Sequence, residues 1–64
     1  MRIIDAIKEK ASQYSTEIIL ETIRTIGGGY VDQDKRMVRA ALIDLYAERT
    51  SEDAADNLMD EIGL

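Results

Sequence analysis

The chain has 64 residues, no cysteine or histidine, and a formal net charge of −5 at pH 7. A chain of this length should form one domain, residues 1–64, and buries only about 60% of the surface that its unfolded form would expose. Disulfides and zinc sites built on cysteine or histidine are excluded, so helix packing and self-association are left as sources of stability.

The first predicted element is an amphipathic helix over residues 3–14. Its apolar side chains recur at the spacing of one helix face, with 3.6 residues per turn. They are Ile3, Ile4, Ile7, Ala11 and Tyr14. Polar residues occupy the remaining arc, so this helix should bury one side against a core.

A second amphipathic helix is predicted over residues 17–26, with Ser15 or Thr16 capping its first turn through a hydroxyl oxygen. Its apolar face consists of Ile18, Ile19, Ile23 and Ile26. The segment is rich in β-branched residues, which also favour a strand, but an alternating strand would expose half of these isoleucines. Whether this helix continues the first one is left open, with residues 12–16 as the weak point.

Gly27, Gly28 and Gly29 form the main break in the predicted fold. Glycine readily adopts the left-handed conformation that lies just past a helix end, so the second helix should stop here. A phosphate-binding loop would need a lysine at P-loop spacing, whereas this loop is followed by Asp32 and Asp34, whose carboxylates would repel an anion. We therefore interpret the glycines as a linker between two helices.

The third predicted helix covers residues 33–49, with Asp32 capping its start. Its main apolar stripe consists of Met37, Val38, Ala41, Leu42, Leu45 and Tyr46. A second stripe, on the other side, consists of Ala40, Ile43 and Ala47. One apolar face suffices for a helix of a small domain. Two stripes indicate that this helix lies at the centre of the bundle, or that its second stripe contacts another copy of the chain in a homodimer.

The fourth predicted helix follows residues 50–53, whose sequence matches a capping box with Thr50 as the cap and Asp53 reaching back. Its apolar face consists of Ala54, Ala55, Leu58, Met59 and Ile62. Gly63 fits the left-handed position after the last turn. Leu64 is then expected to fold back on Leu58 or Met59, as in a Schellman motif.

The net charge is concentrated in the last fourteen residues. Residues 1–50 carry all eight Lys and Arg and eight of the 13 Asp and Glu, so they sum to zero. A row of carboxylates on one helix face is commonly the solvated side of that helix, but it can also bind a basic protein partner. Both interpretations stay open, and the candidate partner-binding residues are Glu52, Asp53, Asp56 and Asp60.

A small regulator that binds nucleic acid is the alternative hypothesis. Lys35, Arg36 and Arg39 cluster at the start of the third predicted helix, and such clusters contact phosphates. Arg24 can lie nearby across the glycine turn. The net charge of −5 and the isoelectric point of about 4.5 count against this hypothesis, because nucleic-acid-binding domains are usually basic.

The predicted fold is therefore an all-α, compact bundle of three to four short amphipathic helices. Without cysteine and histidine, a general acid–base or nucleophilic site lacks its usual residues, so we expect a non-catalytic protein without cofactor or metal. It should act through protein–protein interaction and self-association, in the manner of a phage- or plasmid-type accessory or inhibitor protein. No apolar run approaches the about 18 residues of a membrane span, and no signal-peptide pattern opens the sequence. These patterns predict a cytoplasmic protein with no membrane contact.

Overall fold

The computed structural model describes residues 2–64, and within them it contains four helices and no strand. The helices are α1 (Ile3–Ala11), α2 (Thr16–Ile26), α3 (Gln33–Arg49) and α4 (Glu52–Ile62). The predicted all-α bundle is confirmed, and the strand considered for the second segment is wrong. Over residues 2–64, no helix combines the length and the apolar character that crossing a bilayer requires.

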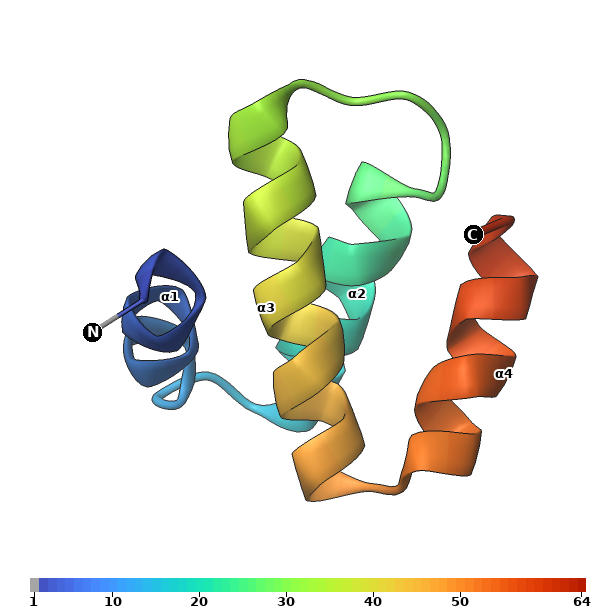
Figure 1. Cartoon of the computed structure of the whole chain (residues 1–64). Helices are drawn as coiled ribbons and strands as arrows, with labels where there is room; N and C mark the ends of the chain where they lie inside the picture. Colours follow the sequence, from blue (N-terminus) through green and yellow to red (C-terminus); the bar gives the residue numbers. More distant parts are fainter. Residues whose placement is uncertain (1) are drawn as a thin grey trace.

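The central helix of the bundle is α3. It packs against each of the other three helices, and Figure 1 shows it in front of α2, with α1 and α4 on either side. The main apolar stripe predicted for this helix faces inward, where Ala41, Leu42 and Leu45 are buried. Leu42 and Leu45 share one core cluster with Ile19 and Ile23 of α2, which are both fully buried. Of the two explanations that the sequence left open for the second stripe, the structure thus shows the central position of the third helix.

A turn separates α1 from α2, so the two helices are not continuous. The prediction that the first helix extends to Tyr14 is wrong, because α1 ends at Ala11. The Ser12 hydroxyl donates to a backbone carbonyl oxygen of the last turn of α1 at 2.6 Å. The Ser15 hydroxyl accepts from the Ile18 N–H at 3.2 Å and caps α2. Short hydroxyl side chains compete in this way with helical backbone bonds, which explains the break.

Two isoleucines that were expected on buried faces lie at the surface. Ile3 is 60% exposed and Ile18 is 52% exposed. Ile3 is the first residue of α1. At this position, the helix itself can cover the side chain only from the side of the following turn. Ile18 is one position away from the line that joins Ile19 and Ile23 at i, i+4 spacing, and one position turns the side chain by about 100° around the helix.

Both ends of the loop between α2 and α3 lie where the sequence places them. α2 ends at Ile26 as predicted, and Gly27 directly after it has a φ of +72° and a ψ of −178°. This positive-φ backbone suits glycine, but it is not the left-handed helical conformation expected at this position. The Asp32 carboxylate accepts a hydrogen bond from the Lys35 N–H at 2.9 Å and caps α3. The glycines are thus a linker between two helices, and the cap satisfies one of the free amides at the start of α3.

The start of α4 differs from the prediction, because Ser51 is the cap and Thr50 is not. The Ser51 hydroxyl accepts from the Ala54 N–H at 3.0 Å. The Thr50 hydroxyl instead donates to the Tyr46 carbonyl oxygen in the last turn of α3, at 2.7 Å. In the part of the chain that the structure describes, the Asp53 carboxylate makes no bond back to the cap. Because the Thr50 hydroxyl is bound to a carbonyl of α3, the Ser51 hydroxyl is the one that caps α4.

The end of α4 is the predicted Schellman motif. Gly63 has a φ of +85°, its N–H donates to the Asp60 carbonyl oxygen at 3.2 Å, and the Leu64 N–H donates to the Met59 carbonyl oxygen at 2.8 Å. These two bonds are the pair that defines the motif.

Candidate interaction surface

An open groove lies between α3 and α4, with a volume of about 470 Å³. We call it the α3–α4 groove. Its apolar lining consists of Ala40, Ile43, Ala47, Ala55, Met59 and Leu64. Its charged lining consists of Arg36, Arg39, Asp44, Glu52 and Asp56. The groove thus combines small and apolar side chains with charges of both signs.

The second apolar stripe predicted for the third helix lies in this groove. Ala40 is exposed, and Ile43 and Ala47 are partly buried. Part of the Ile43 side chain packs against the core cluster. By helical spacing the stripe lies on the side of α3 opposite its main stripe. Ala55 and Met59 of α4 line the same groove, so the chain itself covers this second apolar face of the central helix only in part.

The acidic residues of α4 reach the same groove only in part. Glu52, Asp53, Asp56 and Asp60 are all exposed, but only Glu52 and Asp56 line the α3–α4 groove. Among the described residues, none of the four carboxylates takes part in an ion pair. The structure therefore brings two of the predicted partner-binding acids next to the predicted self-association stripe, and it leaves Asp53 and Asp60 outside the groove.

Arg39, one of the three residues of the predicted basic cluster, is a structural residue of the fold. It is only 7% exposed, and its guanidinium donates to the Gly27 carbonyl oxygen at 2.7 Å and to the Gly29 carbonyl oxygen at 3.2 Å. A glycine-rich loop offers carbonyl groups without helical partners, and Arg39 satisfies two of them. Lys35 and Arg36 remain exposed at the start of α3.

The sequence contained a signal for the role of Arg39 that residue clustering alone misses. Arg39 precedes Ile43 by four positions and Tyr46 by seven, so it lies between the two apolar stripes of α3 rather than on a solvated side. An arginine between apolar stripes, beside a loop rich in free carbonyls, is expected to donate to that loop.

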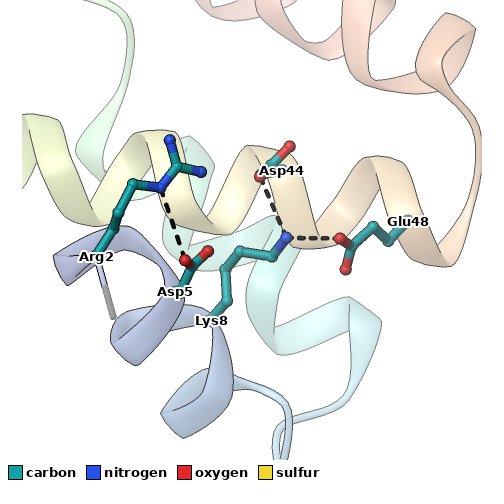
Figure 2. Close-up of polar contacts among 5 residues, drawn as sticks. All are labelled: Arg2, Asp5, Lys8, Asp44 and Glu48. Carbon is teal, nitrogen blue, oxygen red and sulfur yellow. Dashed lines mark hydrogen bonds and ion pairs between the residues drawn. The ribbon is translucent and has the colours of Figure 1, made fainter.

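Lys8 connects α1 to α3. Its ammonium lies 3.2 Å from Asp44 and 2.5 Å from Glu48, and Figure 2 shows it reaching from α1 to both carboxylates, with the Arg2–Asp5 pair (3.6 Å) beside it. The hydrogen bonds to Glu48 and Asp44 raise the pKa of Lys8 above its ordinary value of 10.5. Asp44, which also lines the α3–α4 groove, therefore has a counterion from its own chain.

Arg49 performs a similar function at the turn between α1 and α2. Its guanidinium donates to the Tyr14 carbonyl oxygen at 2.6 Å and to the Ser12 carbonyl oxygen at 2.7 Å. Neither Arg49 nor Lys8 was singled out as important from the sequence, because each partner is at least 33 residues away along the chain. Contacts of this separation leave no periodic pattern in a single sequence.

A second groove, of about 550 Å³, lies among α1, α2 and α3. It contains the exposed side chains of Tyr14 and Ile18, and Ile7 and Val38 form part of its wall. Tyr14 and Ile18 were predicted on buried helix faces, so this surface was not expected from the sequence. Lys10 is the one charged residue that lines it within residues 2–64.

Neither groove contains a cluster of metal ligands: within residues 2–64, no three carboxylates come close enough together to hold a metal ion. Comparison with protein-family models, with curated proteins and with solved structures found no match. The arrangement of the side chains themselves is therefore the basis for a functional proposal.

Proposed function

We propose that the protein is a non-catalytic protein-interaction module that binds a second copy of itself and a basic protein partner. The observation that carries the proposal is the apolar stripe Ala40, Ile43 and Ala47, which lies open in the α3–α4 groove. A 64-residue chain has a small core, so burial of a further apolar stripe would add substantially to its stability. Association with another molecule removes the stripe from water.

The expected self-association is weak and depends on concentration. Complete burial of an isoleucine side chain contributes about 1.5–3 kcal/mol, and Ile43 is already partly buried in the monomer. The two alanines add little area, although they let another helix approach closely. The pairing should therefore respond strongly to one charged substitution at the centre of the stripe.

The experiment is sedimentation equilibrium of the wild-type chain, of Ile43→Glu and of Ile18→Glu. The wild-type chain should form dimers as its concentration rises, and Ile43→Glu should stay at the monomer mass of 7.2 kDa. Ile18→Glu is the matched control, because it places the same charge on an exposed isoleucine outside the α3–α4 groove. Circular dichroism checks that each variant is helical. A wild-type monomer at every concentration, or equal dissociation of both variants, contradicts the proposal.

The acidic residues of α4 are the proposed contact with the basic partner. Their support is that Glu52, Asp53, Asp56 and Asp60 are exposed and that none is neutralised by an ion pair within the described chain. Replacing Asp53 and Asp60, which lie outside the α3–α4 groove, by asparagine should weaken capture of the partner from host extract and leave helicity and dimerisation intact. If the double variant retains the same proteins as the wild-type chain, these two acids belong only to the solvated face of α4.

Binding of nucleic acid through Lys35, Arg36 and Arg39 has less support than the interaction module. The guanidinium of Arg39 donates to the glycine loop, and the neighbouring Arg24 pairs with Glu61. Two exposed cations are then left to contact phosphates, which is few for a chain of net charge −5. A cytoplasmic location stays a prediction from the sequence and is checked by cell fractionation.

A further inference from the structure

We propose that the α3–α4 groove receives α3 of a second copy in an antiparallel orientation, with Arg36 of each copy against Glu52 of the other. The inference rests on the proposed self-association and adds to it the orientation, the register and the charged contacts of the dimer. In this dimer Glu52 pairs with Arg36 of the other copy, so the basic partner is left to the remaining acids of α4. Three features of the groove lead to it: the spacing of the apolar stripe, the distribution of charge along the groove, and the counterion that Lys8 provides to Asp44.

The residues of the open face of α3 have the spacing of a two-helix seam. Arg36, Ala40, Ile43 and Ala47 follow one another in steps of four, three and four residues, which is the repeat that keeps side chains along the contact line of two packed helices. Alanine on both sides of Ile43 allows the two helix axes to approach to the short end of the usual range, about 8 Å. The stripe therefore fits a helix that lies along it.

The charges along the groove select the antiparallel orientation. α4 starts directly after α3 and packs against it, so Glu52, at the start of α4, lies at the end of the groove where α3 finishes. Arg36, in the first turns of α3, lies at the opposite end. An antiparallel pair places Arg36 of each copy next to Glu52 of the other, whereas a parallel pair places like charges together. The helix dipoles also favour the antiparallel pair.

In the proposed dimer, a two-fold axis passes between positions 43 and 44 of the paired α3 helices. Its position determines which residues of the two helices lie opposite each other. It places Ala40 of one copy opposite Ala47 of the other and brings the two Ile43 side chains together at the centre. The Asp44 carboxylates of both copies come near the axis in this arrangement. Each of them has the ammonium of Lys8 of its own chain at 3.2 Å. Because Lys8 also pairs with Glu48, the repulsion between the two Asp44 carboxylates is reduced and not removed.

Cysteine cross-linking tests the orientation and the register, since the chain has no cysteine of its own. Under mild oxidation, Ala40→Cys mixed with Ala47→Cys should give a disulfide-linked heterodimer, and neither variant alone should cross-link. In the antiparallel pair, two copies of position 40 lie about 10 Å apart along the helix axes, which exceeds the Cα separation of about 7 Å that a disulfide tolerates. Glu21→Cys, on the exposed side of α2, is the control that should not cross-link.

Charge reversal tests the end contacts independently. Arg36→Glu and Glu52→Arg should each raise the dimer dissociation constant about tenfold, and an equimolar mixture of the two variants should form heterodimers with wild-type affinity. In such a heterodimer, residue 36 of each chain again lies against a residue 52 of opposite charge in the other chain. If neither single substitution weakens the dimer, the proposed contact between Arg36 and Glu52 is wrong.

The outcomes separate this inference from the proposed function. Cross-linking of Ala40→Cys or Ala47→Cys alone indicates a parallel pair and overturns the inference while self-association stands. A wild-type dimer that gives no cross-link in any combination shows that the copies meet elsewhere, which also overturns it. A wild-type chain that stays monomeric in sedimentation removes both the inference and the self-association on which it rests.

Discussion

Three adjacent glycines in the loop between α2 and α3 occupy three different environments. Gly27 has a φ of +72°, which other residues rarely adopt. Gly28 lies so close to the backbone of Ile62 and Gly63, at the end of α4, that a Cβ atom would overlap the Ile62 carbonyl. Gly29 has free space around it. The sequence shows three identical letters, and only the contact with α4 distinguishes the second from the third.

Alanine substitutions should separate these environments. Gly28→Ala should lower the free energy of unfolding by about 1–3 kcal/mol, because backbone atoms of α4 must move to admit the methyl group. Gly29→Ala, the matched control, should be neutral or should stabilise by up to about 1 kcal/mol through the unfolded chain. Urea denaturation followed by circular dichroism measures both. Equal effects of the two substitutions would show that Gly28 does not contact the end of α4.

Arg39 contributes to stability in the same loop. Arg39→Met keeps a long apolar side chain but removes the donors to the Gly27 and Gly29 carbonyl oxygens. Because hydrogen bonds to a charged donor are lost, the free energy of unfolding should fall by about 1.5–3 kcal/mol. Lys35→Met is the control on the exposed side of α3 and should change it by less than about 0.5 kcal/mol. A similar loss in both variants would contradict the structural role of Arg39.

At the scale of the helices, local signals predicted where most elements begin and end. The caps Ser15 and Asp32 and the glycines after α2 and α4 act on neighbouring backbone groups, so a short stretch of sequence contains the information. Thr50 and Ser51 can both cap a helix by type, with serine preferred over threonine, and the Thr50 hydroxyl is occupied by the carbonyl of Tyr46. The relative placement of α4 and α3 depends on contacts between distant residues, which no local pattern records.

The ion pair between Arg24 of α2 and Glu61 of α4 makes this helix contact sensitive to acid. The hydrogen bond from the Arg24 guanidinium, at 2.8 Å, lowers the pKa of Glu61 below its ordinary value of 4.5. A carboxylate with a lowered pKa in the folded state stabilises the fold above its unfolded pKa. This contribution is lost as the pH falls from about 4.5 through the lower folded pKa.

Glu61→Gln should therefore reduce the melting temperature slightly at neutral pH and have no effect in strong acid. The effect is small because both side chains are about half exposed and added salt screens the pair. Thermal melts of the wild-type chain, of Glu61→Gln and of the control Glu17→Gln, across the range from neutral pH to about pH 3, measure it. A difference between the wild-type chain and Glu61→Gln that is the same at every pH would show that the pair does not form.

For the whole molecule, the sequence predicted the all-α bundle, because periodic apolar faces are sufficient for it. The central position of α3 was one of two explanations for its second stripe, and the helix contacts show that α3 is central. The candidate site was predicted in separate pieces. The apolar stripe around Ile43 and the acids Glu52 and Asp56 proved to be neighbours in one groove, while Arg39 was assigned to the surface and is buried. The groove around Tyr14 and Ile18 was missed, since it forms where three helices meet.

The central claim is that the open face of α3 is where this molecule binds other chains. The most direct measurement is a dilution series of NMR spectra of the wild-type protein at neutral pH. The account predicts that the resonances of Ala40, Ile43 and Ala47 shift with concentration, while those of Tyr14 and Ile18 in the second groove stay fixed. Shifts confined to Tyr14 and Ile18, or spectra that do not change between the lowest and the highest concentration, would contradict it.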